Sequence, residues 1–406
     1  MHENMALYIE FQLKKLAQFT STPGLGVSRL PFTKEAADCA EYIKKIMQEA
    51  GLEVHIDGSG GVIGRLEGKG KKIVMCGSHY DSVMYGGEFD GIAGVVCGIA
   101  AAKHFHDNNI VPENTIEIIA LNDEEGVRFK GGYHTSKALL GIGDIHSMYT
   151  VKDINGITLI DAMEEAGYSL EDYLGCKRNL DEIKAFLEVH VEQGPILQNH
   201  HRQIGIVDNI VGIRRYITDI HGRTDHAGTT PMNMRIDAMA AAAAIIAQVG
   251  DIARRYPGSV ATVAYMNTFP NEINTIANRV QFGIDIRSSS EEIIDRISAE
   301  FMQLVDRVCR KHGTTFHLNP TLAVEPVDMN KEIGRVIEKS CVENGYKYEH
   351  INSGAGHDSL IIGEYIDTAM IFVPSVGGRS HCKEEYSKYT DLEKATNVLI
   401  DTMQNI

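Results

Sequence analysis

Three consecutive acids, Asp123, Glu124 and Glu125, follow the apolar run 116–121 in the stretch "IEIIALNDEEGVRF". The run has the apolar, β-branched composition of a buried strand. Buried carboxylates without a partner are costly, so positive charge is expected close to this cluster. For one such run alone, a charged loop after a strand is the ordinary interpretation, and only the rest of the chain can decide against it.

Three other strand-like runs lead into polar residues in the same manner, and a glycine-rich loop adds one more acid. "KKIVMCGS" leads into His79 and Asp81, and the glycine-rich "MYGGEFDG" then supplies Asp90. "AFLEV" leads into His190, and "AMIFVPSVGGRS" leads into His381. Because the carboxyl ends of parallel strands lie along one edge of an open sheet, these side chains are expected to meet there.

Each of these signals is weak alone, because a single histidine beside a strand is usually structural and the chain has 17 histidines. Four strand ends with the same chemistry indicate a metal site instead. Imidazole and carboxylate ligands without thiolate suit Zn²⁺ or Mn²⁺, with Co²⁺ or Ni²⁺ as further candidates. Five ligands exceed the needs of one catalytic zinc and predict two divalent ions, about 3.5–4 Å apart, that share a carboxylate. The predicted ligands are His79, Asp90, Glu125, His190 and His381.

Glu124 is the acid left over if Glu125 binds metal. A carboxylate beside the attacking water can take its proton and pass it to a leaving group. A carboxylate that only supports a ligand or faces solvent fits the spacing equally well, so both interpretations stay open at this point.

Composition restricts the class of protein. A length of 406 residues predicts two domains, and the net charge of −16 argues against a nucleic-acid partner. Seven scattered cysteines without a CxxC pair suit a reducing compartment. No signal-peptide pattern and no apolar run of about 20 residues is visible, so we expect a cytoplasmic protein without a membrane partner.

Apolar runs and helical patterns alternate over the first half of the chain and again from about 325. This alternation predicts an α/β domain with a doubly wound, mainly parallel sheet, made of residues 1–208 and 325–406. Residues 209–324 show the order β-α-β-β-α-β instead, including the amphipathic helix "SSEEIIDRISAEFMQLVDRVCRKHG". That order is the split βαβ pattern and predicts an inserted ferredoxin-like domain.

Seven motifs occur in an order that resembles the di-metal aminoacylase and carboxypeptidase superfamily known as M20. They are "GSHYDSV", "GGEFDGIAGV", "DEEGVRF", "EVHVEQGPIL", "GRTDHAGTTPMNMRIDA", "SGAGHDS" and "MIFVPSVGGRSH". Within M20 they are similar to the ureido-hydrolysing branch of N-carbamoyl-L-amino-acid hydrolases, β-ureidopropionases and allantoate amidohydrolases. His190 stands where peptidase members typically carry a carboxylate, and "EQGP" after it is typical of the branch. Cys382-Lys383 departs from the Asn-Pro that relatives often carry after the last metal histidine.

The resemblance implies a role for each matching residue. Asp90 would bridge the two ions, with His79 and His190 on one and Glu125 and His381 on the other. Asp81 would hold His79, and Glu124 would be the general base and then the general acid.

The resemblance also implies substrate contacts. Gln193 would contact the ureido group, Asn274 and Arg287 the substrate carboxylate, and Gly356 would offer backbone contacts. His226 would reach the active site of the partner subunit and stabilise the oxyanion. The inserted domain would then serve as a lid and as the dimerisation domain of a homodimer.

The expected reaction is hydrolysis of a linear ureido C–N bond in a small carboxylate-bearing substrate, either an N-carbamoyl-L-amino acid or allantoate. Two alternatives stay open. One is an aminoacylase or aminopeptidase of the same superfamily, against which His190 and Gln193 speak. The other is a catalytically inactive, metal-dependent binding protein, against which the complete ligand set with Glu124 speaks.

Overall fold

The computed structural model describes residues 4–406, which form two compact units. Unit 1 comprises the chain up to Asp208 together with Asp328–Ile406, and unit 2 is Asn209–Val327. The second boundary thus lies at 327 rather than at 324, and each unit has its own hydrophobic core.

Unit 1 is built around a nine-stranded sheet of order β1-β2-β4-β3-β5-β13-β6-β11, with β12 paired to β6. The strands are β1 (Glu53–Ile56), β2 (Val62–Leu66), β3 (Ile73–His79), β4 (Thr115–Leu121), β5 (Ile183–Val191), β6 (Ile204–Ile210), β11 (Val327–Asp328), β12 (Tyr348–Ser353) and β13 (Thr368–Val373). The central strands β4, β3, β5 and β13 are mutually parallel, whereas β1, β2 and β6 pair antiparallel at the flanks. The sheet is therefore mixed but mainly parallel, as the alternation of runs predicts.

The four central strands are those whose ends carry the predicted ligands. His79 is the last residue of β3 and lies opposite Leu121, the last residue of β4. His190 lies opposite Phe372 across β5 and β13. Register therefore brings these strand ends to one edge of the sheet.

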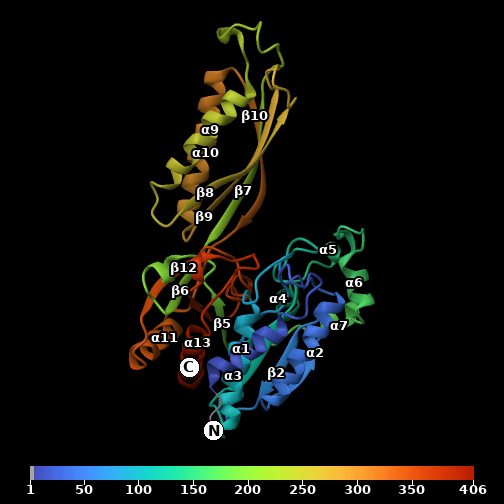
Figure 1. The fold of residues 1–406 in the computed structure, drawn as a ribbon, viewed down its shortest axis with the longest axis vertical. Helices are drawn as coiled ribbons and strands as arrows, with labels where there is room; N and C mark the ends of the chain where they lie inside the picture. Colours follow the sequence, from blue (N-terminus) through green and yellow to red (C-terminus); the bar gives the residue numbers. More distant parts are fainter. Residues whose placement is uncertain (1–3) are drawn as a thin grey trace. The chain divides into compact units, whose positions relative to one another are not determined.

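Helices cover both faces of this sheet, which makes it doubly wound (Figure 1). The longer helices are α1 (Met5–Leu16), α2 (Lys34–Glu49), α3 (Ile92–Asp107), α11 (Lys331–Glu343) and α13 (Tyr389–Asn405). The shorter ones are α4 (His134–Leu140), α5 (Ile145–Thr150), α6 (Leu159–Glu165), α7 (Leu170–Gly175), α8 (Ile196–Asn199) and α12 (Asp358–Ile362). The main core joins the longer helices to one face, and a second cluster joins α4 and α12 to the other.

Unit 2 is a four-stranded antiparallel sheet of order β10-β7-β9-β8 with two helices. Its elements are β7 (Gly212–His221), α9 (Ala238–Ala253), β8 (Val260–Phe269), β9 (Arg279–Ser288), α10 (Glu291–His312) and β10 (Thr315–Val324). This is the β-α-β-β-α-β order read from the sequence. In β9 buried residues alternate with half-buried ones, because α9 and α10 pack on one face only (Figure 1).

The boundaries of α10 follow from its caps. The Ser290 side chain accepts a hydrogen bond from the Ile293 N–H, and Gly313 ends the helix in the left-handed conformation with φ of 69°. Both were expected from the Ser and Gly that flank the amphipathic run.

No helix within residues 4–406 has both the length and the apolar character that crossing a bilayer requires.

Candidate metal centre and active site

The predicted ligands of unit 1 converge at the carboxyl edge of the central strands. Four groups of potential ligand atoms each lie within 4.8 Å of one another: His79, Asp90 and His190; Asp90, Glu125 and His381; His79, Glu124 and Glu125; and Glu188, His190 and His357. His79, Asp90 and His190 are each at most 7% exposed, whereas the His381 side chain is 50% exposed. The site is therefore buried on one side and open on the side of His381.

Asp90 lies at the centre and turns its two oxygens to different partners. Oδ1 is 3.2 Å from Nε2 of His190 and 3.9 Å from Nε2 of His79. Oδ2 is 3.1 Å from Nε2 of His381, and that nitrogen is 3.6 Å from Oε1 of Glu125. A carboxylate that separates two sets of donor atoms in this way has the geometry of a bridging ligand.

Backbone contacts orient two of the imidazoles. Nδ1 of His190 lies 2.9 Å from the Val191 carbonyl oxygen, and Nδ1 of His79 lies 3.1 Å from the Asp81 carbonyl oxygen. A carbonyl accepts only from N–H, so Nδ1 carries the proton in both rings and Nε2 keeps its lone pair towards Asp90. Gly91, with φ of 64°, permits this approach, since a Cβ there would lie 2.4 Å from the His79 ring.

The Asp81 side chain bonds the backbone of the acidic segment, and its contact with the His79 ring is longer. Its two carboxylate oxygens accept the N–H groups of Glu124 and Glu125 at 3.1 and 3.2 Å. Its Oδ1 lies 3.5 Å from Nδ1 of His79, beyond hydrogen-bond range. Asp81 therefore positions both acids and holds His79 through its backbone carbonyl.

The electrostatics of the centre call for added positive charge. Burial, together with the nearby negative charge of Asp90, raises the pKa of Glu125 to about 7. Burial also raises the pKa of Glu124, partly offset by His79. Carboxyls that are costly to ionise together become stable when cations bind between them. The nitrogen and oxygen donors, grouped on the two sides of Asp90, fit a pair of borderline or hard divalent ions.

Gln193 lies directly against the ligands. Its Nε2 donates to both Asp90 oxygens, at 3.1 and 3.0 Å, and its backbone adopts the left-handed conformation with φ of 57°. Its Oε1 is buried and has no hydrogen-bond partner among residues 4–406. A buried acceptor of this kind suits a substrate N–H donor.

Gly356 is close to Tyr133 in unit 1. A Cβ at Gly356 would lie 2.3 Å from the Tyr133 hydroxyl, so a glycine is required for this approach. The Tyr133 N–H donates to the Glu124 carbonyl at 3.2 Å, which connects this contact to the acidic segment.

Unit 2 does not bring its three predicted residues together. The segment of His226 pairs with Thr275, and the Ala227 N–H donates to the Asn274 carbonyl, so His226 and Asn274 are neighbours. Arg287 lies near the other end of β9 and bonds Asp285 at 2.8 Å. Asn274 lies in the turn between β8 and β9, and the first paired residue of β9 after that turn is Arg279. From Arg279 to Arg287 the extended strand advances by eight residues, which is roughly 26 Å.

Several buried polar residues at the site escape sequence reasoning. Glu188 accepts from the hydroxyls of Ser78 and Ser359 at 2.7 and 2.5 Å, and the ring centroid of His357 lies 4.3 Å from that of His190, with the two rings tilted by 56°. Glu385 contacts the backbone of Asp90. In the sequence, Glu385 is marked only by its position four residues after His381. It belongs to a charged run that is typical of a solvent-exposed loop, so the sequence does not predict its burial.

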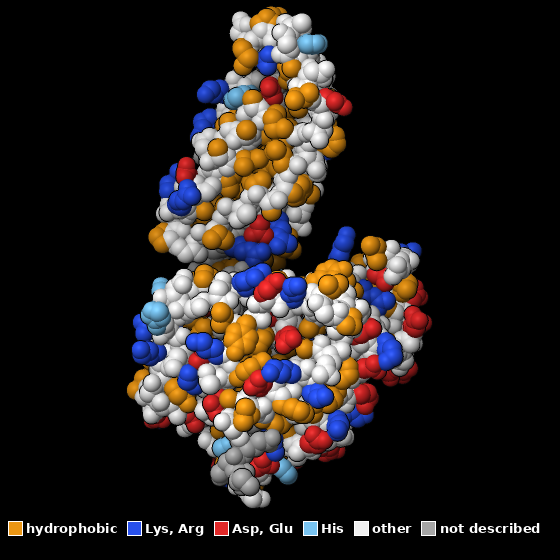
Figure 2. Space-filling model, viewed as in Figure 1, with side chains coloured by type: hydrophobic (Ala, Val, Ile, Leu, Met, Phe, Trp, Pro, Cys, Tyr) orange, Lys and Arg blue, Asp and Glu red, His pale blue; other side chains and the backbone are white. Residues whose placement is uncertain are grey.

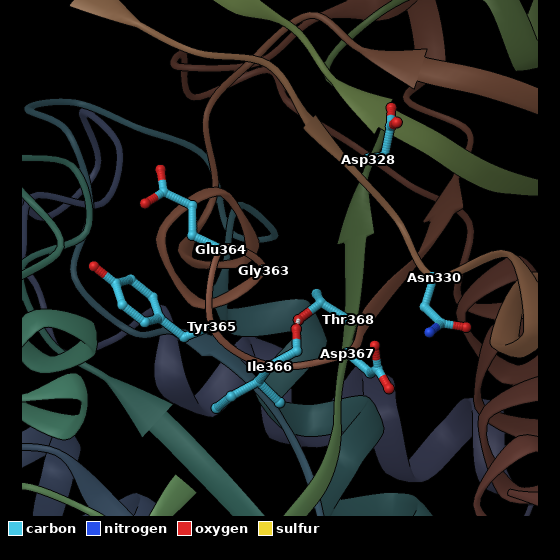
Figure 3. A pocket seen from close by; sticks show the side chains of 8 residues that line it. All are labelled: Asp328, Asn330, Gly363, Glu364, Tyr365, Ile366, Asp367 and Thr368. Carbon is cyan, nitrogen blue, oxygen red and sulfur yellow. Dashed lines mark hydrogen bonds between the residues drawn. The ribbon is translucent and has the colours of Figure 1, made fainter.

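A cavity of about 240 Å³ lies elsewhere, at the start of β13 (Figure 3). Its lining includes Asp328, Glu364 and Asp367, whose carboxylates point in different directions. Thr368 of the lining begins β13, whereas the metal-centre residues follow the strand's other end. The cavity is thus separate from the candidate centre.

Residues 75–405 match peptidase family M20/M25/M40, and the chain belongs to this family. Within it the chain falls in the hydantoinase/carbamoylase branch, and it is an amidohydrolase that acts on non-peptide C–N bonds.

Three relatives illustrate the branch. The N-carbamoyl-L-amino-acid amidohydrolase of Paenarthrobacter aurescens is 36% identical over 98% of this chain and 97% of its own length. The allantoate amidohydrolase of Bacillus subtilis is 34% identical over 98% of this chain and 96% of its own. The crystal structure of a hydantoinase/carbamoylase-family amidase from Burkholderia multivorans superposes with a TM-score of 0.91 at 31% identity, covering 98% and 97% of the two chains.

Proposed function

We propose that this protein hydrolyses the linear ureido group of a small carboxylate-bearing substrate, either an N-carbamoyl-L-amino acid or allantoate. The observation that carries the proposal is the buried centre at Asp90. Each oxygen of this carboxylate faces a different group of possible metal ligands, and a second buried acid, Glu124, lies beside them. Relatives of similar identity carry both substrate names, so the substrate is left between these two classes.

Two divalent ions per subunit, Zn²⁺ or Mn²⁺ with Co²⁺ or Ni²⁺ as alternatives, would be held by this centre. His79, Asp90 and His190 would hold one ion, and Asp90, Glu125 and His381 the other. When bound, the ions polarise the ureido carbonyl and make water a stronger acid.

Glu124 is the proton carrier in this proposal. Its buried carboxylate, with a raised pKa, accepts a proton from the attacking water and returns it to the departing nitrogen. The Glu124 N–H donates to Asp81, so the carboxylate is held at a defined place. An amine-bearing acid, CO₂ and ammonia are the products.

Gln193 would bind the ureido group through its unpartnered Oε1, which can accept from a substrate N–H. Gly356 would leave space and backbone contacts for the substrate beside Tyr133. Arg287 suits a carboxylate because its planar guanidinium can bond it with two N–H groups.

A homodimer through unit 2 would complete the site. β8 is an edge strand with apolar side chains exposed at Val260, Tyr265, Met266 and Phe269, and Figure 2 shows hydrophobic side chains over this unit. Such an edge is suited to pairing with another chain. Because roughly 26 Å separates Arg287 from the hairpin end near Asn274, one chain cannot place both on one small substrate. Arg287 on the one hand, and Asn274 with the neighbouring His226 on the other, would therefore reach one substrate only from different subunits.

His226 is suited to donate a hydrogen bond across such an interface. Its Nδ1 accepts the Gly228 N–H at 2.9 Å, so Nε2 carries the proton in the neutral ring. The side chain is exposed, and its Nε2–H can stabilise the negative oxygen that develops on the substrate.

Mixing two inactive variants tests this division of labour. Arg287→Ala and His226→Ala subunits, unfolded together and refolded, are expected to regain activity, because each mixed dimer holds one site with both residues intact. Each variant refolded alone is the control. Mixtures as inactive as the separate variants would contradict a shared site, and light scattering reports the dimer directly.

Gly356→Ala is expected to lower kcat/KM by roughly 10²-fold, the scale of a misplacement of about 1 Å at an active site. The new methyl group must displace Tyr133, whose N–H bonds the Glu124 carbonyl. Gly354→Ala is the matched control, since a Cβ there meets no atom within 4 Å. Equal kinetics for the two variants would remove Gly356 from the site.

A substrate panel tests the reaction itself. Protein loaded separately with Mn²⁺, Zn²⁺ and Co²⁺ is offered allantoate, N-carbamoyl-β-alanine, N-carbamoyl-L-amino acids, N-acetyl amino acids and dipeptides, and ammonia and amine release are measured. Metal-dependent turnover of a ureido acid supports the proposal, and the best substrate selects the class. Turnover of acyl or peptide substrates alone would favour an aminoacylase or aminopeptidase. Binding of a ureido acid without any turnover would favour a binding protein.

The cytoplasm is the proposed location. All seven cysteines are free thiols, six of them buried, as suits a reducing compartment.

A further inference from the structure

Glu385 is a buried carboxylate in a loop whose neighbouring residues are exposed. It follows His381 by four residues and is 4% exposed, whereas Lys383 and Glu384 face solvent. Burying a carboxylate is costly unless hydrogen bonds compensate, so the contacts of this side chain require an explanation.

Those contacts join the two loops that carry Asp90 and His381. Oε2 of Glu385 accepts the N–H groups of Phe89 and Asp90, both at 3.0 Å. Oε1 accepts the hydroxyl of Ser380, the residue before His381, at 2.5 Å. One carboxylate thus holds the backbone of the central acid and the neighbour of the last imidazole.

The surroundings keep this arrangement rigid. The Glu385 loop is closed at its base by the Val376 N–H, which donates to the Tyr386 carbonyl at 2.8 Å. On the other side a Cβ at Gly87 would lie 2.1 Å from Oε2, so Glu385 packs directly on the glycine backbone. The two N–H groups it satisfies immediately precede α3, where negative charge is favourable.

We propose that Glu385 is a positioning residue that sets the spacing between Asp90 and His381 and thereby the affinity for the ion they share. The inference rests on the proposed function, because it assumes that these two residues bind metal. Glu385 is not in any of the groups of residues that could hold an ion in the described chain. Residues that orient metal ligands in this manner typically contribute a factor of about 10–100 in metal affinity.

Binding of Mn²⁺ alone, measured by calorimetry on the full-length protein, tests the inference. Glu385→Ala is expected to bind Mn²⁺ about 10–100-fold more weakly than wild type. Glu385→Gln is expected to keep most of the affinity, because its amide oxygen can accept both N–H groups and its NH₂ can donate to Ser380. Glu384→Ala, which removes an exposed acid paired with Arg379 at 3.0 Å, is the matched control and should bind like wild type.

A purely structural role is distinguished by stability. Val398→Ala, in the buried core of α13, should lower the Tm of the metal-free protein without weakening Mn²⁺ binding. Glu385→Ala should weaken Mn²⁺ binding, whereas Val398→Ala should not do so even when its loss of Tm is as large. If Glu385→Ala does not fold, Ser380→Ala removes one of the three hydrogen bonds to Glu385, together with the 3.4 Å contact of the same hydroxyl to Oδ2 of Asp90, and should weaken binding in the same direction.

The outcomes separate this inference from the proposed function. The positioning role would be overturned, and the proposed function would stand, if Glu385→Ala bound Mn²⁺ with wild-type affinity. The same holds for Ser380→Ala where that variant is needed. Equally weak binding by Glu385→Gln and Glu385→Ala would also overturn it, because the negative charge rather than the hydrogen bonds would then matter. If wild-type protein binds no Mn²⁺, Zn²⁺ or Co²⁺, both fall.

Discussion

Replacing Glu124 with Gln is expected to lower kcat by about 10²–10⁴-fold, the usual contribution of a general acid–base, while the metal content stays equal to that of the wild-type protein. Glutamine keeps the size of the side chain but cannot accept the proton of the attacking water. The measurement is steady-state kinetics on the best ureido substrate, with metal content determined by mass spectrometry on the same sample.

The adjacent acid provides the control for this prediction. Asp123 is 2% exposed, and burial raises the pKa of its carboxyl well above the usual range, which disfavours the charged form. Asp123→Asn keeps the shape of this side chain and should change kcat far less. If Glu124→Gln retained wild-type kcat, the proton-carrier role would be lost, and the alternative of a supporting carboxylate would replace it.

Asp90→Asn is expected to abolish tight binding of both ions and to leave no measurable turnover. Each oxygen of Asp90 faces a different donor set, so no other residue in the centre can replace it on both sides. Asparagine offers one neutral oxygen and an NH₂ group that cannot bind a cation. Metal content after gel filtration and calorimetry with Mn²⁺ measure the loss.

Asp81→Asn is the comparison for Asp90→Asn. Asp81 contacts the backbone of Glu124 and Glu125 rather than facing the donor sets, so its loss should weaken metal binding by about 10–100-fold without abolishing it. Two ions bound at wild-type affinity in Asp90→Asn would exclude a bridging carboxylate. The centre would then have to hold its metal through Glu125 and the histidines.

Much of this protein can be predicted from local patterns. Residue periodicity and cap residues predict α10, the order of elements in unit 2 and the central strands, because these signals depend on neighbours only a few positions apart. The convergence of His79, Asp90, Glu125, His190 and His381 is also predictable. Parallel strands necessarily end at one edge, so polar residues after four such strands must lie close together.

Other features depend on contacts between distant parts of the chain. The antiparallel pairing of β2 with β4 and of β6 with β13 joins distant segments, which short apolar runs do not specify. Glu385 belongs to an exposed-looking charged run, and only the approach of residues 87–90, nearly 300 positions away, makes it a buried acceptor. Asn274 and Arg287 are 13 positions apart in sequence, yet the extended strand β9 separates them. Sequence spacing therefore determines which residue types are available, and pairing and register decide which of them can act at one site.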